Sequence, residues 1–371
     1  MRKFLLLLSL VGYLSSIYSQ EDTTDTEFET HIVQNNTKHK GGVGSFGRSL
    51  SHLTSFVSLN GYATNEFLSY QDGKNTFNSH YFNLLASAEV TDKIFAEIQM
   101  EYEYGGTSLE ARYAQVDYKF NDRFIIRSGK FLVPAGEFNE YLYPEYLSKT
   151  TNRAFVNENI IPVSWGEVGV QLRGNFISPE DSAFINPFYS IYLVNGLRGQ
   201  NGGDLRPMRG NVLDTTGSVA YGGNLGTQIG NHFNIQFNYY YGDYDPTATL
   251  DLIIAGSSVS YDDDKFSFYG SFHTAQQEYL TDINNPDSED VLNKFGFYGQ
   301  VAYKFKNFEP VLRYDQIRLD GAQELNKDRF TFGMNYYFYK HCVVKVNYEL
   351  IKNQGIDLKD NLFSLQLALG F

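Results

Sequence analysis

The chain has 371 residues, a formal net charge of −13 and a single cysteine, Cys342. The acidic surplus argues against a nucleic-acid partner, because phosphate binding needs a basic face, and one cysteine excludes an intramolecular disulfide. Aromatic residues make up 16% of the chain and glycine is abundant, which favours strands joined by turns over helices.

Residues 1–19 have the features of a secretory signal peptide. Arg2 and Lys3 precede the apolar stretch FLLLLSLVGYL, which is too short to span a bilayer as a helix. Residues 20–51 are polar and then glycine-rich, so we expect a flexible periplasmic extension. The segment GVGSFG within it matches G-x-G-x-x-G, but no strand pattern precedes it and no helix pattern follows, which favours a linker over a nucleotide site.

From residue 52 to residue 371, hydrophobic and polar side chains alternate with a period of two. In IFAEIQMEYEY, for example, Ile94, Ile98 and Tyr102 share one face while Glu97 and Glu101 share the other. The pattern recurs in segments of roughly 9–13 residues, the length of tilted strands in a membrane. About 16 such segments are expected, at 53–66, 80–91, 94–104, 110–120, 123–132, 167–177, 186–196, 216–229, 232–244, 250–262, 265–279, 294–305, 308–319, 329–339, 342–353 and 361–371.

The connections between these segments alternate in length. Tight polar turns such as 121–122 and 230–231 alternate with longer connections such as 197–215 and 280–293. This alternation predicts an all-β transmembrane antiparallel barrel with short periplasmic turns and long extracellular loops. A soluble β-rich protein is the alternative, but it would need large sheets without covering helices. Aromatic residues near the short turns are expected to form a periplasmic girdle: Tyr118, Phe120, Phe124, Phe233, Phe266, Phe268, Phe305, Phe308, Tyr337 and Tyr339.

One stretch of the chain contains sequence motifs in addition to the alternating pattern. The segment from Ser128 to Gly174 contains SGKF, then VPAGEF, a long connection, and WGEVGV leading into the next strand. This arrangement resembles the phosphate-selective porin O and P family and its porin-like relatives. The resemblance implies a trimeric 16-stranded barrel whose third loop folds into the lumen. The dense ladder of Arg and Lys found in specific members of that family is missing here, so phosphate selectivity does not transfer.

Alternation also indicates which charged side chains face the lumen. On the strands these are Glu97, Glu101, Asp117, Arg127 and Arg173; on the third loop, Glu137, Glu140 and Arg153 are the candidates for a constriction. Two interpretations remain open and are compatible. The charges either set up a transverse field that selects ions, or form ion pairs that hold the third loop in place.

The sequence therefore predicts an outer-membrane porin, a passive channel for small hydrophilic solutes or ions. The alternative is a structural or adhesive barrel that presents its loops and keeps its lumen largely closed. Expected partners are outer-membrane lipid and lipopolysaccharide, two further copies in a homotrimer, and the barrel-assembly machinery, which is expected to read Phe371 at the end of the last strand. No cofactor, metal or enzymatic activity is expected: Ser271 and His273 share a strand face without a G-x-S-x-G motif, and acidic groups such as Asp243 and Asp245 suit turns better than Ca²⁺ binding.

Overall fold

A computed structural model describes residues 57–103, 108–177, 184–213, 216–320, 326–354, 358 and 360–371. The expected signal peptide and the expected extension at 20–51 lie outside the described residues, and so does Leu53 at the start of the first expected strand. In the described ranges no helix is long and apolar enough to cross a membrane.

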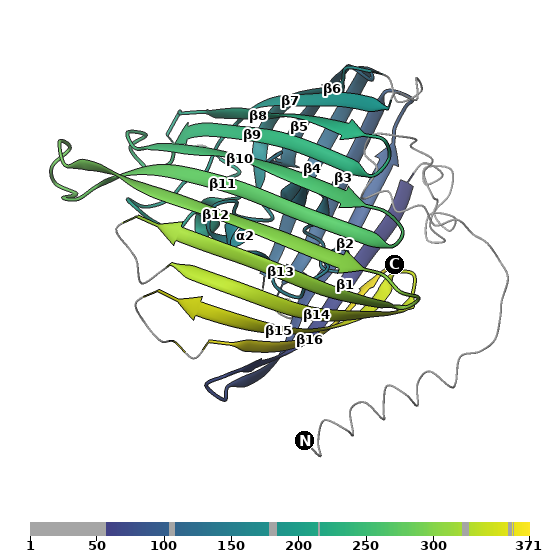
Figure 1. Ribbon diagram of the computed structural model, residues 1–371. Helices are drawn as coiled ribbons and strands as arrows, with labels where there is room; N and C mark the ends of the chain where they lie inside the picture. Colours follow the sequence, from purple (N-terminus) through teal and green to yellow (C-terminus); the bar gives the residue numbers. More distant parts are fainter. Residues whose placement is uncertain are drawn as a thin grey trace. The chain divides into compact units, whose positions relative to one another are not determined.

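Sixteen strands form a closed antiparallel barrel in which each strand pairs with its neighbours in sequence and β1 pairs with β16 (Figure 1). The predicted fold class is therefore confirmed. The strands are β1 Val57–Tyr70, β2 Asn75–Glu89, β3 Ile94–Glu103, β4 Ser108–Asn121, β5 Phe124–Leu132, β6 Gly166–Asn175, β7 Ile185–Val194, β8 Ala220–Ile229, β9 Phe233–Asp243, β10 Asp251–Asp262, β11 Phe266–Leu280, β12 Glu289–Tyr303, β13 Phe308–Leu319, β14 Lys327–Tyr339, β15 Cys342–Asn353 and β16 Leu362–Gly370.

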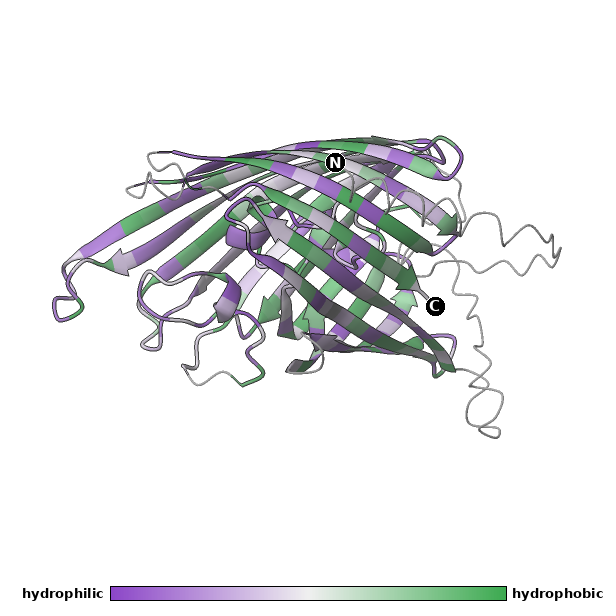
Figure 2. Ribbon diagram, turned by 90° about the horizontal axis from the view of Figure 1, so that it is seen from below, coloured by the Kyte–Doolittle hydropathy of each residue, from purple (hydrophilic) through white to green (hydrophobic). Residues whose placement is uncertain are grey.

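The period of two in the sequence becomes an inward and an outward face of the barrel. Figure 2 shows hydrophilic and hydrophobic residues alternating along the strands. On β16, Ser364 and Gln366 are fully buried, whereas Leu367 between Gln366 and Ala368 is exposed on the outside. An outer face of this kind is compatible with lipid, and the polar inner face is the one that water can fill.

The barrel closes between the first and last strands. Tyr62 to Tyr70 of β1 pair with Gly370 to Leu362 of β16, and the backbone N–H groups of Gly61 and Phe371 each donate to the other residue's carbonyl, at 2.7 and 2.8 Å. A Cβ at Gly61 would meet the Phe371 ring, so glycine allows this close approach. Closure satisfies the backbone groups that an open edge would leave unpaired in a membrane.

Two local expectations are wrong. β1 and β2 continue to a tight turn at 71–74, where the sequence suggested a loop at 67–79; Phe67 and Phe77 pair across these strands with ring centroids 4.9 Å apart. Tyr337 points inward and donates to Glu309 at 2.8 Å, because it shares the inward face of β14 with the buried Thr331 and Asn335. Its neighbours in the expected girdle, such as Phe305 and Phe308, are exposed.

Two connections at one end of the barrel contain buried structure. Residues 133–165, between β5 and β6, form the third loop. They include the π-helical turn η3 Phe138–Leu142 and the helix α2 Val156–Asn159, which contacts β11, β12 and β13 inside the ring of strands (Figure 1). Residues 195–219, between β7 and β8, include the 3₁₀ turn η5 Arg206–Met208. Side chains of both connections join one apolar cluster, so these connections fill part of the lumen.

Candidate pore and constriction

The inner wall formed by β3, β4 and β5 carries paired charges. Arg127 makes a bidentate ion pair with Asp117 on the neighbouring strand, with nitrogen–oxygen distances of 2.7 and 2.8 Å. Glu97 accepts hydrogen bonds from the Tyr113 hydroxyl and the Gln115 amide, both at 3.2 Å. These residues lie on the inward face that alternation assigns to them, and their charges are engaged with neighbours on the same wall.

Arg112 joins this wall although strict alternation would place it outside. A register shift opposite Gln99 makes Arg112 the extra residue of a bulge in β4, and its side chain turns inward, where it is 3% exposed. Its guanidinium donates to Glu101, to Glu103 at 3.1 Å and to Glu110 at 2.9 Å. The signal in the sequence is an arginine at a lipid-facing position, which would cost about 2–4 kcal/mol at the bilayer midplane and so favours a bulge.

Residues near the start of the third loop contact the barrel wall. Arg173 of β6 lies 3.7 Å from Glu140 and donates to the Tyr141 hydroxyl at 3.4 Å. The backbone N–H of Glu137 donates to the Ser258 hydroxyl of β10 at 3.4 Å. Glu137 and Glu140 therefore lie where the loop turns into the lumen, and they contact β10 and β6.

Burial of the Glu137 carboxyl raises its pKa to about 7, and the nearby carboxylates of Asp262 and Glu140 act in the same direction. Hydrogen bonds from Ser260 and Asn234 oppose this shift. The packed loop thus favours the neutral form of Glu137 at a pH where an exposed glutamate is charged.

A second group of charges lies on β13, β14 and β15. Asp315 accepts from Arg313 at 3.1 Å and from Arg329 at 2.9 Å, and Arg329 also donates to Glu349 at 3.0 Å. All four side chains are at most 4% exposed. Asp315 also accepts the backbone N–H of Phe155 at 3.0 Å, so this buried network is tied to the third loop.

The same wall holds residues 145–153 of the loop along their length. Lys149 makes an ion pair with Glu309 at 2.8 Å, and Thr151 shares a hydrogen bond of 2.6 Å with Ser364. The polar side chains that reach the loop backbone or its hydroxyls from the wall are Arg313, Arg329, Asn335, Lys345 and Asn347. Contacts on four consecutive strands, β13 to β16, fix this segment across the lumen.

Residues 145–153 lie between two cavities. One, of about 470 Å³, is lined by this segment together with Tyr81 and residues of α2 and η5, on the side of the long connections. The other, of about 260 Å³, is lined by Tyr146, Leu147 and Lys149 together with residues of the short turns near 262–265, 304 and 340–341. The segment is therefore the barrier between a hollow at one end of the barrel and a hollow at the other.

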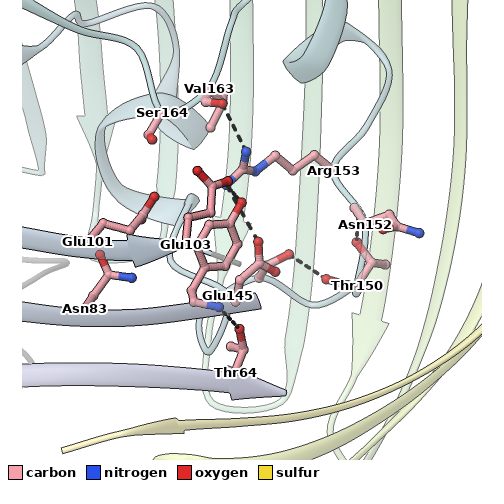
Figure 3. Close-up of polar contacts among 12 residues, drawn as sticks. Thr64, Asn83, Glu101, Glu103, Glu145, Thr150, Asn152, Arg153, Val163 and Ser164 are labelled. Carbon is pink, nitrogen blue, oxygen red and sulfur yellow. Dashed lines mark hydrogen bonds and ion pairs between the residues drawn. The ribbon is translucent and has the colours of Figure 1, made fainter. Parts of the chain in front are cut away.

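Arg153 fixes the end of this barrier segment. It donates to the carbonyl of Val163 at 3.0 Å and to the Tyr81 hydroxyl at 3.4 Å, and it lies 3.7 Å from Glu145 (Figure 3). Glu101 and Glu103 approach the same region from β3 (Figure 3). Arg153 thus joins two distant parts of the third loop to each other and to the barrel wall.

The connection at 195–219 covers the third loop and was not expected from the sequence to do so. Arg209 donates to the carbonyls of Pro162, Val163 and Ser164 at 3.2, 2.6 and 3.4 Å. Leu205 and Met208 are at most 2% exposed. Arg209 of the connection at 195–219 thereby provides a cationic hydrogen-bond donor for the carbonyl groups at the end of the third loop.

The structure aligns Ser271, His273 and Asn238 in one hydrogen-bonded row, with 2.8 Å for each contact. The site is closed, because His273 is 1% exposed and the neighbouring cavity is about 10 Å³, smaller than any ester or peptide substrate. This row fills space between the wall and the third loop.

The acidic turns are held by their own backbone. Asp245 accepts the backbone N–H groups of Thr249 and Leu250, both at 2.7 Å, and Asp263 accepts those of Lys265 and Phe266, also at 2.7 Å. Across the described ranges, no group of three or more His, Cys, Asp or Glu side chains is arranged to hold a metal ion.

No protein-family model matches the chain. An uncharacterized protein of Aquifex aeolicus (strain VF5) is 24% identical over 349 residues, which cover 86% of this chain and 75% of that protein. This relative carries no functional description to compare.

Solved porin structures share the fold at low identity. The anion-selective porin from Comamonas acidovorans has a TM-score of 0.59 at 12% identity and matches 85% of this chain and 99% of its own. OmpF of Salmonella typhi, solved in complex with daunomycin, has a TM-score of 0.59 at 12% identity, and the match covers 85% of this chain and 97% of OmpF. The outer membrane channel DcaP of Acinetobacter baumannii has a TM-score of 0.56 at 14% identity, and the match covers 85% of this chain and 97% of DcaP. The chain is thus a porin-like barrel, whereas the narrower likeness to phosphate-selective porins finds no counterpart among these matches.

Proposed function

We propose that the protein is a passive diffusion channel for small hydrophilic solutes or ions in the outer membrane of a Gram-negative bacterium. The observation that carries this proposal is the barrier at 145–153, which lies inside a closed barrel with a polar inner face and separates a cavity at each end. A short barrier between two polar hollows suits a filter of limited width. Several proteins with this fold are named as porins or channels.

Charge pairing supports a weak preference for cations over anions. In the described part of the lumen, Arg112, Arg127, Arg313 and Arg329 each contact a carboxylate. A phosphate ladder needs arginines and lysines that are free to contact the anion. The proposed kinship with the phosphate-selective porin O and P family therefore extends to the barrel and the loop motif rather than to phosphate transport. The net charge of −13 adds to the attraction of cations.

The proposed assembly follows from the same reasoning. Exposed outward side chains such as Leu193, Leu225 and Phe237 provide the surface for outer-membrane lipid or for neighbouring subunits of a homotrimer. Lipopolysaccharide is the proposed contact around the long connections. The barrel-assembly machinery is the proposed reader of Phe371 and the last strand.

Swelling of proteoliposomes tests the proposal. Purified folded protein, checked by heat-modifiable gel migration, is reconstituted in vesicles loaded with an impermeant polymer, and swelling is followed in isotonic arabinose and then in larger sugars. A channel gives swelling rates that fall steeply with solute size. A barrel closed by its loops, the structural or adhesive alternative, gives the rate of protein-free vesicles for every solute.

A further inference from the structure

The cavity on the long-connection side of the barrier is lined by two opposite charges, those of Glu158 and Arg206, that contact no charged group in the part of the chain that the structure describes. It is bounded by the third loop, the second infolded connection and Tyr81 of β2, and it has a volume of about 470 Å³. Cavities of a few hundred Å³ accommodate small metabolites. Asp204, Pro207 and Asn159 in its lining are exposed, so the cavity communicates with solvent.

Apart from the exposed carboxylate of Asp204, the charges in this cavity fall into two classes. Arg153 and Glu145 contact each other at 3.7 Å, and Arg153 also holds Val163 and Tyr81, so this pair is engaged in building the wall. Within the described ranges, the carboxylate of Glu158 and the guanidinium of Arg206 make no hydrogen bond and no ion pair. Both line the cavity and both are partly buried.

Glu158 of α2 and Arg206 of η5 line the same cavity without contacting each other. Burial raises the pKa of Glu158, and the guanidinium groups of Arg329, Arg206 and Arg153 oppose that shift. Because the two groups do not contact each other, a gap is left between an anion and a cation on the wall of one cavity. A ligand that carries an ammonium group and a carboxylate a few bonds apart bridges such a gap, with a charge-assisted hydrogen bond at each end.

We propose that this cavity is a binding subsite for zwitterionic solutes, namely free amino acids and very short peptides. Glu158 receives the ammonium group and Arg206 receives the carboxylate. The role of this subsite in transport rests on the proposed channel function. A solute that arrives from the long-connection side meets the cavity before the barrier, so binding there concentrates zwitterions at the entrance to the constriction.

Ligand-observed NMR on the detergent-folded protein tests the subsite without requiring conduction. L-alanyl-L-alanine is the probe, N-acetyl-L-alanine and L-alanine methyl ester are the singly charged controls, and lactamide is the neutral control. We expect the dipeptide to bind more tightly than all three. Glu158→Gln or Arg206→Gln is expected to weaken its binding up to about fivefold, which corresponds to the upper end of the range for exposed charge pairs.

Arg123→Gln is the matched control, because Arg123 is an exposed arginine at a short turn on the opposite rim; it is expected to leave binding unchanged. Equal binding of the dipeptide and a singly charged control, or unchanged binding in both cavity variants, overturns the subsite. Binding by a protein that gives no swelling would retain the subsite and reject the channel. Swelling without dipeptide binding would retain the channel and reject the subsite.

Discussion

Replacement of Arg329 by methionine is expected to release the third loop while leaving the barrel folded. Arg329 bonds Asp315 at 3.1 and 2.9 Å and Glu349 at 3.0 Å, and it donates to the carbonyl of Arg153 in the loop. Its guanidinium also lies 4.1 Å from the centre of the Phe155 ring. Methionine keeps most of the apolar volume and removes every one of these polar contacts.

The loss of docking free energy in Arg329→Met is large because the ion pairs of Arg329 are buried. Removal of one member of a buried ion pair costs about 3–5 kcal/mol, because a buried charge is left without compensation. Arg313 still contacts Asp315 at 3.1 Å and lessens that loss, so we take the lower bound of about 3 kcal/mol for docking of the loop. Since 1.4 kcal/mol corresponds to a factor of ten, the undocked fraction should rise about 100-fold.

Hydrogen–deuterium exchange of the folded protein measures this directly. The Phe155 amide, which donates to Asp315, reports loop docking, and peptides covering residues 150–160 should exchange about 100-fold faster in Arg329→Met. Arg318→Met is the matched control: its pair with Asp328, at 2.6 Å, is 19% exposed on both sides and is expected to contribute at most about 1 kcal/mol. Equal exchange of these peptides in the two folded variants would refute the assignment of the buried network as the anchor of the loop.

Three further predictions concern assembly, selectivity and pH. Deletion of Phe371 removes its two backbone hydrogen bonds to Gly61, so the amount of folded protein in outer membranes should fall while assembled channels keep their conductance; normal folded levels would contradict this. Arg112→Gln leaves three carboxylates without their shared cation, so the reversal potential in a salt gradient should move toward cation selectivity, and an unchanged or anion-directed value would count against the proposed lining. Glu137 has a pKa of about 7 in the docked loop against 4.5 for an unstrained glutamate, so its contribution to docking is complete below pH 4.5 and is lost as the pH rises through 7. Exchange near residue 137, corrected for intrinsic rates, should rise between pH 5 and 8 and lose this dependence in Glu137→Gln; the same rise in the variant would exclude Glu137 as its source.

The barrel could be predicted from the sequence because two physical constraints act on every strand. Lipid on one side of each strand and water on the other impose a period of two. The hydrophobicity of a residue such as Val344 or Lys345 therefore predicts whether its side chain faces lipid or the lumen. Strand pairing without an edge then fixes an antiparallel ring, and β13 and β15 occupy the ranges expected for them. The inward placement of Glu101 and Arg127 follows from the same alternation.

Features that break the period escaped this reasoning. Arg112 enters the lumen through a bulge, and a bulge has no fixed sequence signature. Tyr337 was expected in the girdle because it is an aromatic residue near a turn, although the alternation of β14 places it inside. The inward fold of 195–219 depends on contacts such as Arg209 with the carbonyls of 162–164, which join segments far apart in the chain. The partners of Arg153 and Arg173 were likewise undetermined, because a loop without periodicity does not show which strand it will meet.

Single-channel recording in planar bilayers tests the central claim most directly. Purified, heat-modifiable protein in symmetric potassium chloride should produce discrete conductance steps, and a variant in which residues 147–150 are replaced by two glycines should give larger steps because the barrier at 145–153 is thinner. Folded protein that inserts but gives no steps, in either form, would contradict the assignment of the lumen as a passage.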